Sequence, residues 1–520
     1  MILDIVQTII NYSKLKSQIK CSQVDKYLYD HSYIFSLDAK YNIDQQIIEK
    51  RIFSRLKFLN CRNNEKINNV NHLKNTLKIL ICDNCCGIDQ NGISEIQCIE
   101  ELYCSDNCKI NNVNHLKNTL KILDCSGLCG IDQNGILELK YIEELNCCDN
   151  EKINNVNHLK DTLKILYCGN TMCGIDQNGI SELKYIKELY CSNNSKIYNV
   201  NHLKNTLKIL DCSGSCGIDQ YGISEIQYVE KLDCSDNENI NNVNHVKNTL
   251  KILDCGYRCG IDQNGISELQ YIEILSCNYN KKINNVNHLK NTLKILDCSS
   301  MCEIDQNGIS ELQYIEKLDC YDNRKINNVN HLKNTLIILN CGSYCQIDQR
   351  GISELKYIKV LNCFDNSKIN NVDHLKNTLK ILNCGGQSGI NQNEISELKY
   401  VDELRCPDNS KINNVNHLKD TLKILDCSGY VCGIDQNGIL ELKYVDELYC
   451  SNNSKINNVN HLKDTLGILY CGGQCGINQY GISDLKYIEV LNCDYYGNIN
   501  DKIKDTSHLN IIPEPSQRKN

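Results

Sequence analysis

The sequence predicts an α/β solenoid, in which short parallel strands stack turn upon turn and helical or irregular segments connect them. The first observation is a strict period, because a histidine returns every 43 or 44 residues within the nearly constant text NNVNHLKNTLKIL. These histidines are His72, His115, His158, His202, His245, His288, His331, His374, His417 and His461. Such a period marks a repeat architecture, so the 520 residues are expected to form one array rather than several globular domains.

The second observation is that each period contains two turns of similar pattern. In one of them, Leu189 and Cys191 lie two residues apart and Asn194 follows. Side chains alternate along a strand, so this spacing turns the leucine and the cysteine toward the same, inward side. A single turn cannot bury that side alone, and stability must come from the stacking of neighbouring turns. Counting the cysteine that closes each strand predicts 21 turns, from Cys61 to Cys493.

The recurring pattern, leucine-x-x-leucine-x-cysteine-x-x-asparagine, resembles the leucine-rich repeat family in its shorter class of about 21 or 22 residues per turn. The resemblance extends from Leu56 to Ile499 and implies a right-handed solenoid with a parallel sheet on its concave face and short helical or irregular segments on its convex face. It also implies that the recurrent asparagines satisfy backbone groups of adjacent turns. We therefore divide the chain into a helical N-terminal cap (1–50), the repeat array (51–499) and a C-terminal cap with a disordered tail (500–520).

Most of the 35 cysteines have a place in this pattern. Those that close the strands point inward, and a second set follows the position of the missing asparagine in alternate turns. The cysteines outside both sets are Cys21, Cys85, Cys98, Cys108 and Cys148. The chain opens Met-Ile-Leu-Asp without a basic region, so we expect no secretory signal and a cytoplasmic protein whose buried thiols are reduced and act as small hydrophobes. Without clustered histidines, the cysteine spacing predicts no metal site, and no cofactor is expected.

Composition and motifs predict a protein that is not an enzyme. Paired carboxylates recur only because the repeat recurs, and no phosphate loop, nucleophile elbow or zinc-protease helix is present, so no catalytic residue is predicted. The recurrent histidine is interpreted as a packing or capping residue on the convex side. No apolar run reaches the length of a membrane span, and the net charge of −8 argues against a nucleic-acid groove. The expected partner is another protein.

The candidate binding surface is the concave face, where a column of isoleucines alternates with a mostly acidic column that carries scattered tyrosines. Apolar and aromatic anchors in a polar field are typical of protein recognition. Three basic residues interrupt these columns. The predicted protein-binding residues are Glu101, Tyr103, Glu144, Glu188, Tyr190, Ile209, Asp211, Lys231, Ile252, Lys317 and Arg405. The alternative is that isoleucine is present only for its strand propensity and for mutual cover.

The first 50 residues lie outside the repeat and resemble a degenerate F-box. The residues that carry this resemblance, and that would contact the adaptor, are Ile5, Ile9 and Ile10 in a first helix, followed by Val24, Lys26, Tyr29 and Phe35. The usual leucine-proline opening is missing, and Phe35 stands where a tryptophan is expected. The alternative is an amphipathic cap that covers the first turn of the solenoid.

The F-box resemblance implies the substrate receptor of a cullin-RING ubiquitin ligase, whose N-terminal helices bind a Skp-type adaptor and cullin while the array holds the target. A long, AT-biased repeat array behind such a head is similar to the F-box/leucine-rich repeat proteins of giant amoebal DNA viruses, which would place the protein in the host cytoplasm. The rival hypothesis is a stand-alone leucine-rich repeat scaffold, or a decoy for a host protein, with no F-box activity.

Overall fold

The computed structural model describes residues 33–41, 43–495, 498–499 and 510–511. The chain divides into two compact units, the first formed by Met1–Asp254 with Arg258–Ile261 and the second by Cys255–Tyr257 with Asp262–Asn520. Each unit repeats the same turn, so the fold of each is described by itself below.

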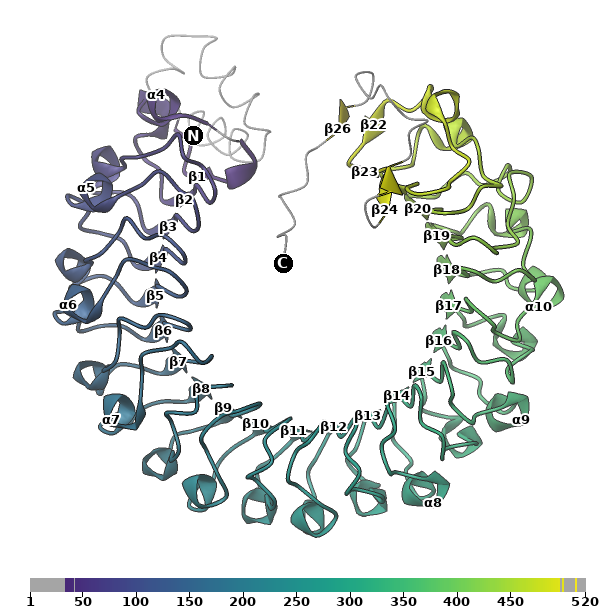
Figure 1. Cartoon of the computed structure of the whole chain (residues 1–520), viewed down its shortest axis with the longest axis horizontal. Coiled ribbons are helices and arrows are strands. Elements are labelled where there is room, and N and C mark those ends of the chain that lie inside the picture. The colour runs from purple at the N-terminus through teal and green to yellow at the C-terminus, as the bar shows by residue number, and fades with distance from the viewer. Residues whose placement is uncertain (1–32, 42, 496–497, 500–509, 512–520) are drawn as a thin grey trace, which may run out of the picture. The chain divides into compact units, whose positions relative to one another are not determined.

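In the first unit, eleven short strands pair in parallel, each with the next one along the chain (Figure 1). They are β1 (Ser36–Leu37), β2 (Phe58–Asn60), β3 (Ile79–Ile81), β4 (Glu101–Tyr103), β5 (Ile122–Asp124), β6 (Glu144–Asn146), β7 (Ile165–Tyr167), β8 (Glu188–Tyr190), β9 (Ile209–Asp211), β10 (Lys231–Asp233) and β11 (Ile252–Asp254). Each of these strands buries one leucine in the core, and in the three-residue strands it is the middle residue.

The second unit repeats this parallel ladder from β12 to β21 and ends it with β23. Its ladder strands are β12 (Ile274–Ser276), β13 (Ile295–Asp297), β14 (Lys317–Asp319), β15 (Ile338–Asn340), β16 (Val360–Asn362), β17 (Ile381–Asn383), β18 (Glu403–Arg405), β19 (Ile424–Asp426), β20 (Glu447–Tyr449), β21 (Ile468–Tyr470) and β23 (Val490–Asn492). At its end β22 (Tyr487–Ile488) pairs with β26 (Asn510–Ile511), and β24 (Asp494–Tyr495) pairs with β25 (Asn498–Ile499). Most of the predicted tail at 500–520 lies outside the described residues.

Within each unit, short helices lie on the side of the turns opposite the strands (Figure 1). The α-helices are α4 (Gln45–Ile48), α5 (Gln90–Ile93), α6 (Gln133–Ile136), α7 (Gln177–Ile180), α8 (Gln306–Ile309), α9 (Gln349–Ile352) and α10 (Gln392–Ser396). The 3-10 helices are η1 (Ala39–Tyr41), η2 (Arg51–Phe53), η3 (Asn71–Leu73), η4 (Asn114–Leu116), η5 (Asn157–Leu159), η6 (Asn201–Leu203), η7 (Tyr221–Ile223), η8 (Asn244–Val246), η9 (Asn264–Ile266), η10 (Asn287–Leu289), η11 (Asn330–Leu332), η12 (Asp373–Leu375), η13 (Asn416–Leu418), η14 (Asn460–Leu462) and η15 (Gln479–Ile482). Parallel strands and repeating turns of this kind confirm the predicted α/β leucine-rich repeat solenoid.

The recurring text Asp-Gln-Asn-Gly folds as a capped turn of helix that also joins neighbouring turns. At α5, the Asp89 carboxylate accepts a hydrogen bond from the Gly92 amide at 2.8 Å, which satisfies a free donor at the helix start. The Gln90 side chain donates to the Asn112 carbonyl at 2.9 Å and accepts from the Asn112 amide at 2.9 Å. This glutamine bridge was not foreseen from the sequence.

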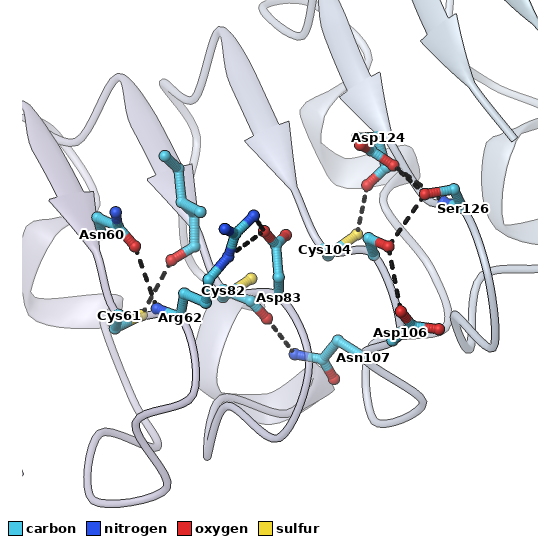
Figure 2. A network of polar contacts seen from close by, with 12 residues as sticks. Asn60, Cys61, Arg62, Cys82, Asp83, Cys104, Asp106, Asn107, Asp124 and Ser126 are labelled. Carbon is cyan, nitrogen blue, oxygen red and sulfur yellow. Dashed lines mark hydrogen bonds and ion pairs between the residues drawn. The ribbon is translucent and has the colours of Figure 1, made fainter. Parts of the chain in front are cut away.

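The predicted asparagine ladder is present and satisfies the backbone of adjacent turns. The Asn107 side-chain amide donates to the Cys82 carbonyl at 2.9 Å (Figure 2). It also donates to the Ile88 carbonyl at 3.2 Å. Its side-chain oxygen accepts from the Lys109 amide at 3.0 Å. With 1% of its surface exposed, Asn107 is as buried as the core leucines, so its hydrogen bonds are needed to avoid a large desolvation cost.

The second cysteine set forms thiol pairs with the strand cysteines of the preceding turns. The sulfur atoms of Cys61 and Cys86 lie 3.5 Å apart, and those of Cys104 and Cys129 lie 3.8 Å apart. Where Ser388 replaces this cysteine, its hydroxyl lies 3.7 Å from the Cys363 sulfur, as expected for a small, weakly polar position. No disulfide bond joins the described cysteines. Its hydrogen bond to Cys129 and burial raise the pKa of the Cys104 thiol well above its ordinary value, so it stays protonated.

The recurrent histidine has the packing role that the sequence predicts. His158 lies in η5, and its Nε2 atom is 3.1 Å from the Ile136 carbonyl of the preceding helical segment. Burial lowers the pKa of this imidazole from its usual range, and the hydrogen bond to Ile136 opposes the shift only in part. The same direction holds for all ten histidines of the repeat.

The parallel ladder begins before the predicted boundary at residue 51. Strand β1 pairs with β2 through Ser36 and Phe58, and α4 follows it with Asp44 as its N-cap. The residues from 36 to 48 therefore form one more turn than the 21 predicted. Its signal is visible in hindsight, because Ile-Asp-Gln at 43–45 repeats the helix-start motif of the later turns. The turn lacks the closing cysteine, and counting cysteines missed it.

Candidate functional site

The candidate site is the strand face, defined as the side chains that the ladder strands direct away from the core. In the first unit the strands are in register, so each first residue lies beside the first residue of the next strand. One column therefore alternates acidic or basic residues with isoleucine in consecutive strands. Its members from β4 to β11 are Glu101, Ile122, Glu144, Ile165, Glu188, Ile209, Lys231 and Ile252.

These columns are less exposed than the sequence suggests. Glu101, Glu144, Ile209 and Ile252 are half-buried, and among the column members from β4 to β11 only Lys231 is exposed. The reason is the close spacing of parallel strands, about 4.8 Å, which lets each side chain cover its two neighbours. This half-burial is compatible with the predicted protein-binding surface and with the alternative of mutual cover.

Tyrosine and glutamate side chains on the same strand are joined by hydrogen bonds. The Tyr103 hydroxyl donates to Glu101 at 3.1 Å, and the Tyr190 hydroxyl donates to Glu188 at 2.9 Å. Burial raises the pKa of Tyr103 to about 12, and the Glu101 charge adds to the effect. These phenols are therefore neutral donors that hold the carboxylates in place.

The second column of the strand face carries a stacked aromatic pair. The rings of Tyr167 and Tyr190 lie parallel, with centroids 4.4 Å apart and planes inclined by 6°. The register of β7 and β8 places them side by side. Further along the same column, Asp211 accepts hydrogen bonds from the Ser213 amide at 3.1 Å and hydroxyl at 2.7 Å. Burial raises the pKa of Asp211, although the Ser213 hydrogen bonds lower it in part.

Like charges collect on the strand face around Glu144. Burial raises the pKa of Glu144, and the charges of Glu188 and Glu101 raise it further. This local excess of negative charge favours a basic group on a partner.

In the second unit the predicted residues Lys317 and Arg405 lie on different parts of the strand face. Lys317 is exposed between Ile295 and Ile338. Arg405 forms an ion pair with Glu403 on its own strand, and its guanidinium lies 6.0 Å from the centre of the Tyr449 ring. The Glu403 and Tyr449 contacts keep the Arg405 side chain half-buried rather than free.

An ion pair that the sequence did not reveal lies near the start of the first unit. The Arg62 guanidinium contacts the Asp83 carboxylate at 2.7 Å and 3.1 Å (Figure 2). The Asp83 side chain is 6% exposed, and burial raises its pKa while Arg62 opposes that shift. Both residues stand two positions after a strand, where several other turns have serine or glycine, and the variability of this position gave no signal for the pair.

Of the residues that carry the F-box resemblance, only Phe35 lies in the part of the chain that the structure describes. Ile5, Ile9, Ile10, Val24, Lys26 and Tyr29 all lie outside the described residues. Phe35 is described, and it belongs to the first turn of the ladder. Its carbonyl accepts hydrogen bonds from the Lys57 amide at 2.8 Å and the Phe58 amide at 3.1 Å, which ties its backbone to β2.

Metal sites and membrane-spanning helices are both absent from the described residues. Among these residues, no three histidine, cysteine or acidic side chains are placed to hold a metal ion. No helix in the same part of the chain is long and apolar enough to cross a membrane.

Comparison with known proteins gives structural likeness without a close relative. No protein-family model matches the chain, and no curated protein matches it. A solved structure titled as the functional domain of InlJ from Listeria monocytogenes, which includes a cysteine ladder, is 20% identical, with 68% of this chain and 74% of that chain covered and a TM-score of 0.42.

Two other solved structures are similar over a larger part of this chain. A TLR13–ssRNA13 complex is 15% identical, with 89% of this chain and 84% of that chain covered and a TM-score of 0.45. The leucine-rich repeat ectodomain of the plant membrane receptor kinase GASSHO1/SCHENGEN3 from Arabidopsis thaliana, in complex with CASPARIAN STRIP INTEGRITY FACTOR 2, is 13% identical, with 88% and 65% covered and a TM-score of 0.35. Because these sequence identities and TM-scores are low, the class of this protein, a leucine-rich repeat solenoid, rests on its own repeating turns.

Proposed function

We propose that this protein is a non-catalytic scaffold that binds another protein on the strand face of its first unit. The observation that carries the proposal is the in-register alternation of glutamate and isoleucine beside the Tyr167–Tyr190 stack. Rigid aromatic groups supply contact area at a low entropic cost, and the half-buried isoleucines complete an apolar surface between charged residues. Glu101, Glu144 and Glu188 favour a partner with a basic patch.

The test is partner capture with a triple charge reversal. The variant Glu101→Lys, Glu144→Lys and Glu188→Lys changes the strand face, whereas Glu138→Lys, Glu182→Lys and Glu225→Lys changes three exposed glutamates of the same unit that pair with lysines elsewhere. Captured proteins are identified by mass spectrometry, and circular dichroism checks that both variants are folded. We expect the first variant to lose partners that the second retains. If both folded variants capture the same partners as the native chain, the strand face is not the binding surface.

A finer proposal is that residues 1–50 recruit a Skp-type adaptor and cullin, which would make the protein a ligase substrate receptor in the cytoplasm. It is supported by the F-box resemblance of the sequence alone. The backbone contacts of Phe35 favour the rival, a stand-alone scaffold or decoy, because they give this residue a structural role in the first turn. Deleting residues 1–32 discriminates between them, since it leaves β1 and α4 intact. Loss of adaptor and cullin from the captured proteins would support the receptor, whereas their absence from both samples would support the scaffold.

A further inference from the structure

A row of exposed tyrosines lies outside the strand face. Each tyrosine stands three residues before a strand, as Tyr141 does before β6, and it recurs in every second turn. In the first unit this tyrosine row consists of Tyr141, Tyr185 and Tyr228, which are 53%, 53% and 52% exposed. Large aromatic side chains that repeat at such exposure are a mark of an interaction surface.

Two grooves accompany the tyrosine row in the first unit. The first has a volume of about 440 Å³ and is lined by Tyr141 together with Thr119, Lys121, Glu143 and Lys164. The second has a volume of about 410 Å³ and is lined by the equivalent residues one repeat later, including Tyr185 and Lys187. Both grooves share Asp161, Thr162 and Lys164, so they adjoin along the array. A ligand that fits one groove can extend into the next.

The spacing of the grooves restricts the ligand. Successive tyrosines are two strands apart, which corresponds to about 10 Å along the array. An extended chain in the polyproline II conformation makes one turn in three residues and rises about 9 Å in that turn. It therefore presents the same face at nearly the interval of the tyrosines. Aromatic-lined grooves are also the usual binding sites for such segments, because the conformation is preformed and has few internal hydrogen bonds to break.

The charges of the two grooves differ. In the first groove Lys164 pairs with Glu143 at 2.5 Å, so its charges are locally balanced. In the second, Lys187 stands where Glu143 stands one repeat earlier, and among the described residues it forms no ion pair. The second groove thus has an excess of positive charge that suits an acidic residue on the ligand.

We propose that the tyrosine row of the first unit binds a proline-rich segment of a partner protein in the polyproline II conformation. Proline rings contact Tyr141 and Tyr185, and an acidic residue of the segment pairs with Lys187. Exposed lysine and asparagine side chains along the grooves can donate to the free carbonyls of the segment. The row continues in the second unit, but there Lys380 lies over the Tyr400 ring at 5.4 Å from its centre, so the proposal is confined to the first unit.

The proposal is tested with the full chain and short fluorescent peptides. The probe is a nine-residue peptide of three Ala-Pro-Pro triplets with glutamate in place of one alanine, compared with the same peptide carrying lysine and with a glycine-serine peptide of equal length and charge. We expect saturable binding of the glutamate peptide by fluorescence anisotropy and affinity that is about tenfold weaker in Tyr185→Ala. Tyr221→Ala is the matched control, because Tyr221 is 82% exposed on η7.

A second variant tests the charge without removing a ring. Lys187→Glu introduces the residue that this position has in the two neighbouring repeats, at Glu143 and Glu230, so the chain is expected to fold. It should reverse the preference so that the lysine peptide binds more tightly than the glutamate peptide.

The triple reversal at Glu101, Glu144 and Glu188 should leave peptide binding unchanged, which separates this site from the proposed strand-face function. Failure of the proline-rich peptides to bind, or equal binding by Tyr185→Ala, would overturn the proposal. Binding of cellohexaose that depends on Tyr185, without peptide binding, would also overturn it in favour of a polysaccharide.

Discussion

Tyr167 and Tyr190 lie ring against ring across β7 and β8, with their centroids 4.4 Å apart, although they are 23 positions apart in the sequence. The Tyr190 hydroxyl at the same time donates to Glu188. The pair is thus held by the strand register on one side and by a carboxylate on the other.

Replacing Tyr190 with alanine should reduce the free energy of unfolding by more than replacing it with phenylalanine. Phenylalanine retains the stack, which is worth about 1 kcal/mol beyond the buried area, and loses only the hydroxyl. Urea unfolding followed by circular dichroism measures both variants. Equal losses would mean that the Glu188 hydrogen bond, rather than ring stacking, stabilises this part of the face. Tyr198→Ala, at a 57% exposed position, is the control.

Acid should destabilise the array through its ten histidines. Burial lowers the folded-state pKa of each imidazole below its ordinary value of 6.5, so the unfolded chain binds protons at a pH where the folded chain does not. The resulting stability is present above pH 6.5 and is lost as the pH falls through the lowered folded pKa. Urea midpoints should therefore decrease from pH 7.5 to pH 5.5.

A single histidine tests the origin of this pH dependence. His158→Gln removes one titrating group and should make the decrease slightly smaller, whereas Lys160→Gln on the exposed side of the same segment should not. A pH dependence identical in His158→Gln and in the native chain would assign the effect to the carboxylates instead.

Native thiol labelling should divide the described cysteines into two groups. Cys85 and Cys108 are exposed and should react within minutes with an uncharged maleimide, while Cys98, Cys148 and Cys493 are half-buried and should react more slowly. The strand cysteines, such as Cys104, should react only after unfolding because burial and thiol pairing keep them protonated and inaccessible. Peptide mass spectrometry identifies the labelled sites. Rapid labelling of Cys104 in the folded chain would contradict the buried ladder.

Two glycines of the second unit should respond oppositely to alanine. A Cβ atom added at Gly481 would lie 2.2 Å from the Asn457 carbonyl oxygen, so Gly481→Ala must displace backbone and should cost about 2 kcal/mol or more. At Gly467 the nearest atom would lie at 3.7 Å, and other repeats carry lysine at this position. Gly467→Ala should therefore be neutral or slightly stabilising. Thermal unfolding of both variants provides the comparison, and similar changes in the two would show that the turn at Gly481 can widen.

The cysteines show how far the burial of a side chain could be predicted from its position in the repeat. Cys85, Cys98, Cys108 and Cys148 were separated from the ladders on spacing alone, and these four are exposed or half-buried in the structure. Cys493 was assigned to the strand-inward set, yet it is half-buried, and it follows the last ladder strand among the described residues. Position in a repeat predicts burial only where a neighbour exists on both sides.

By itself, the sequence determined the period, the strands, the inward leucines and cysteines and the asparagine ladder. It could do so because every internal turn has the same surroundings, and side-chain alternation within a strand needs no distant information. Only the tertiary structure decided which side chains meet across turns, because those contacts join residues some 20 positions apart. The Arg62–Asp83 ion pair, the Tyr167–Tyr190 stack and the half-burial of the strand face all arise from the close approach of neighbouring strands. The grooves beside Tyr141 and Tyr185 have the same origin.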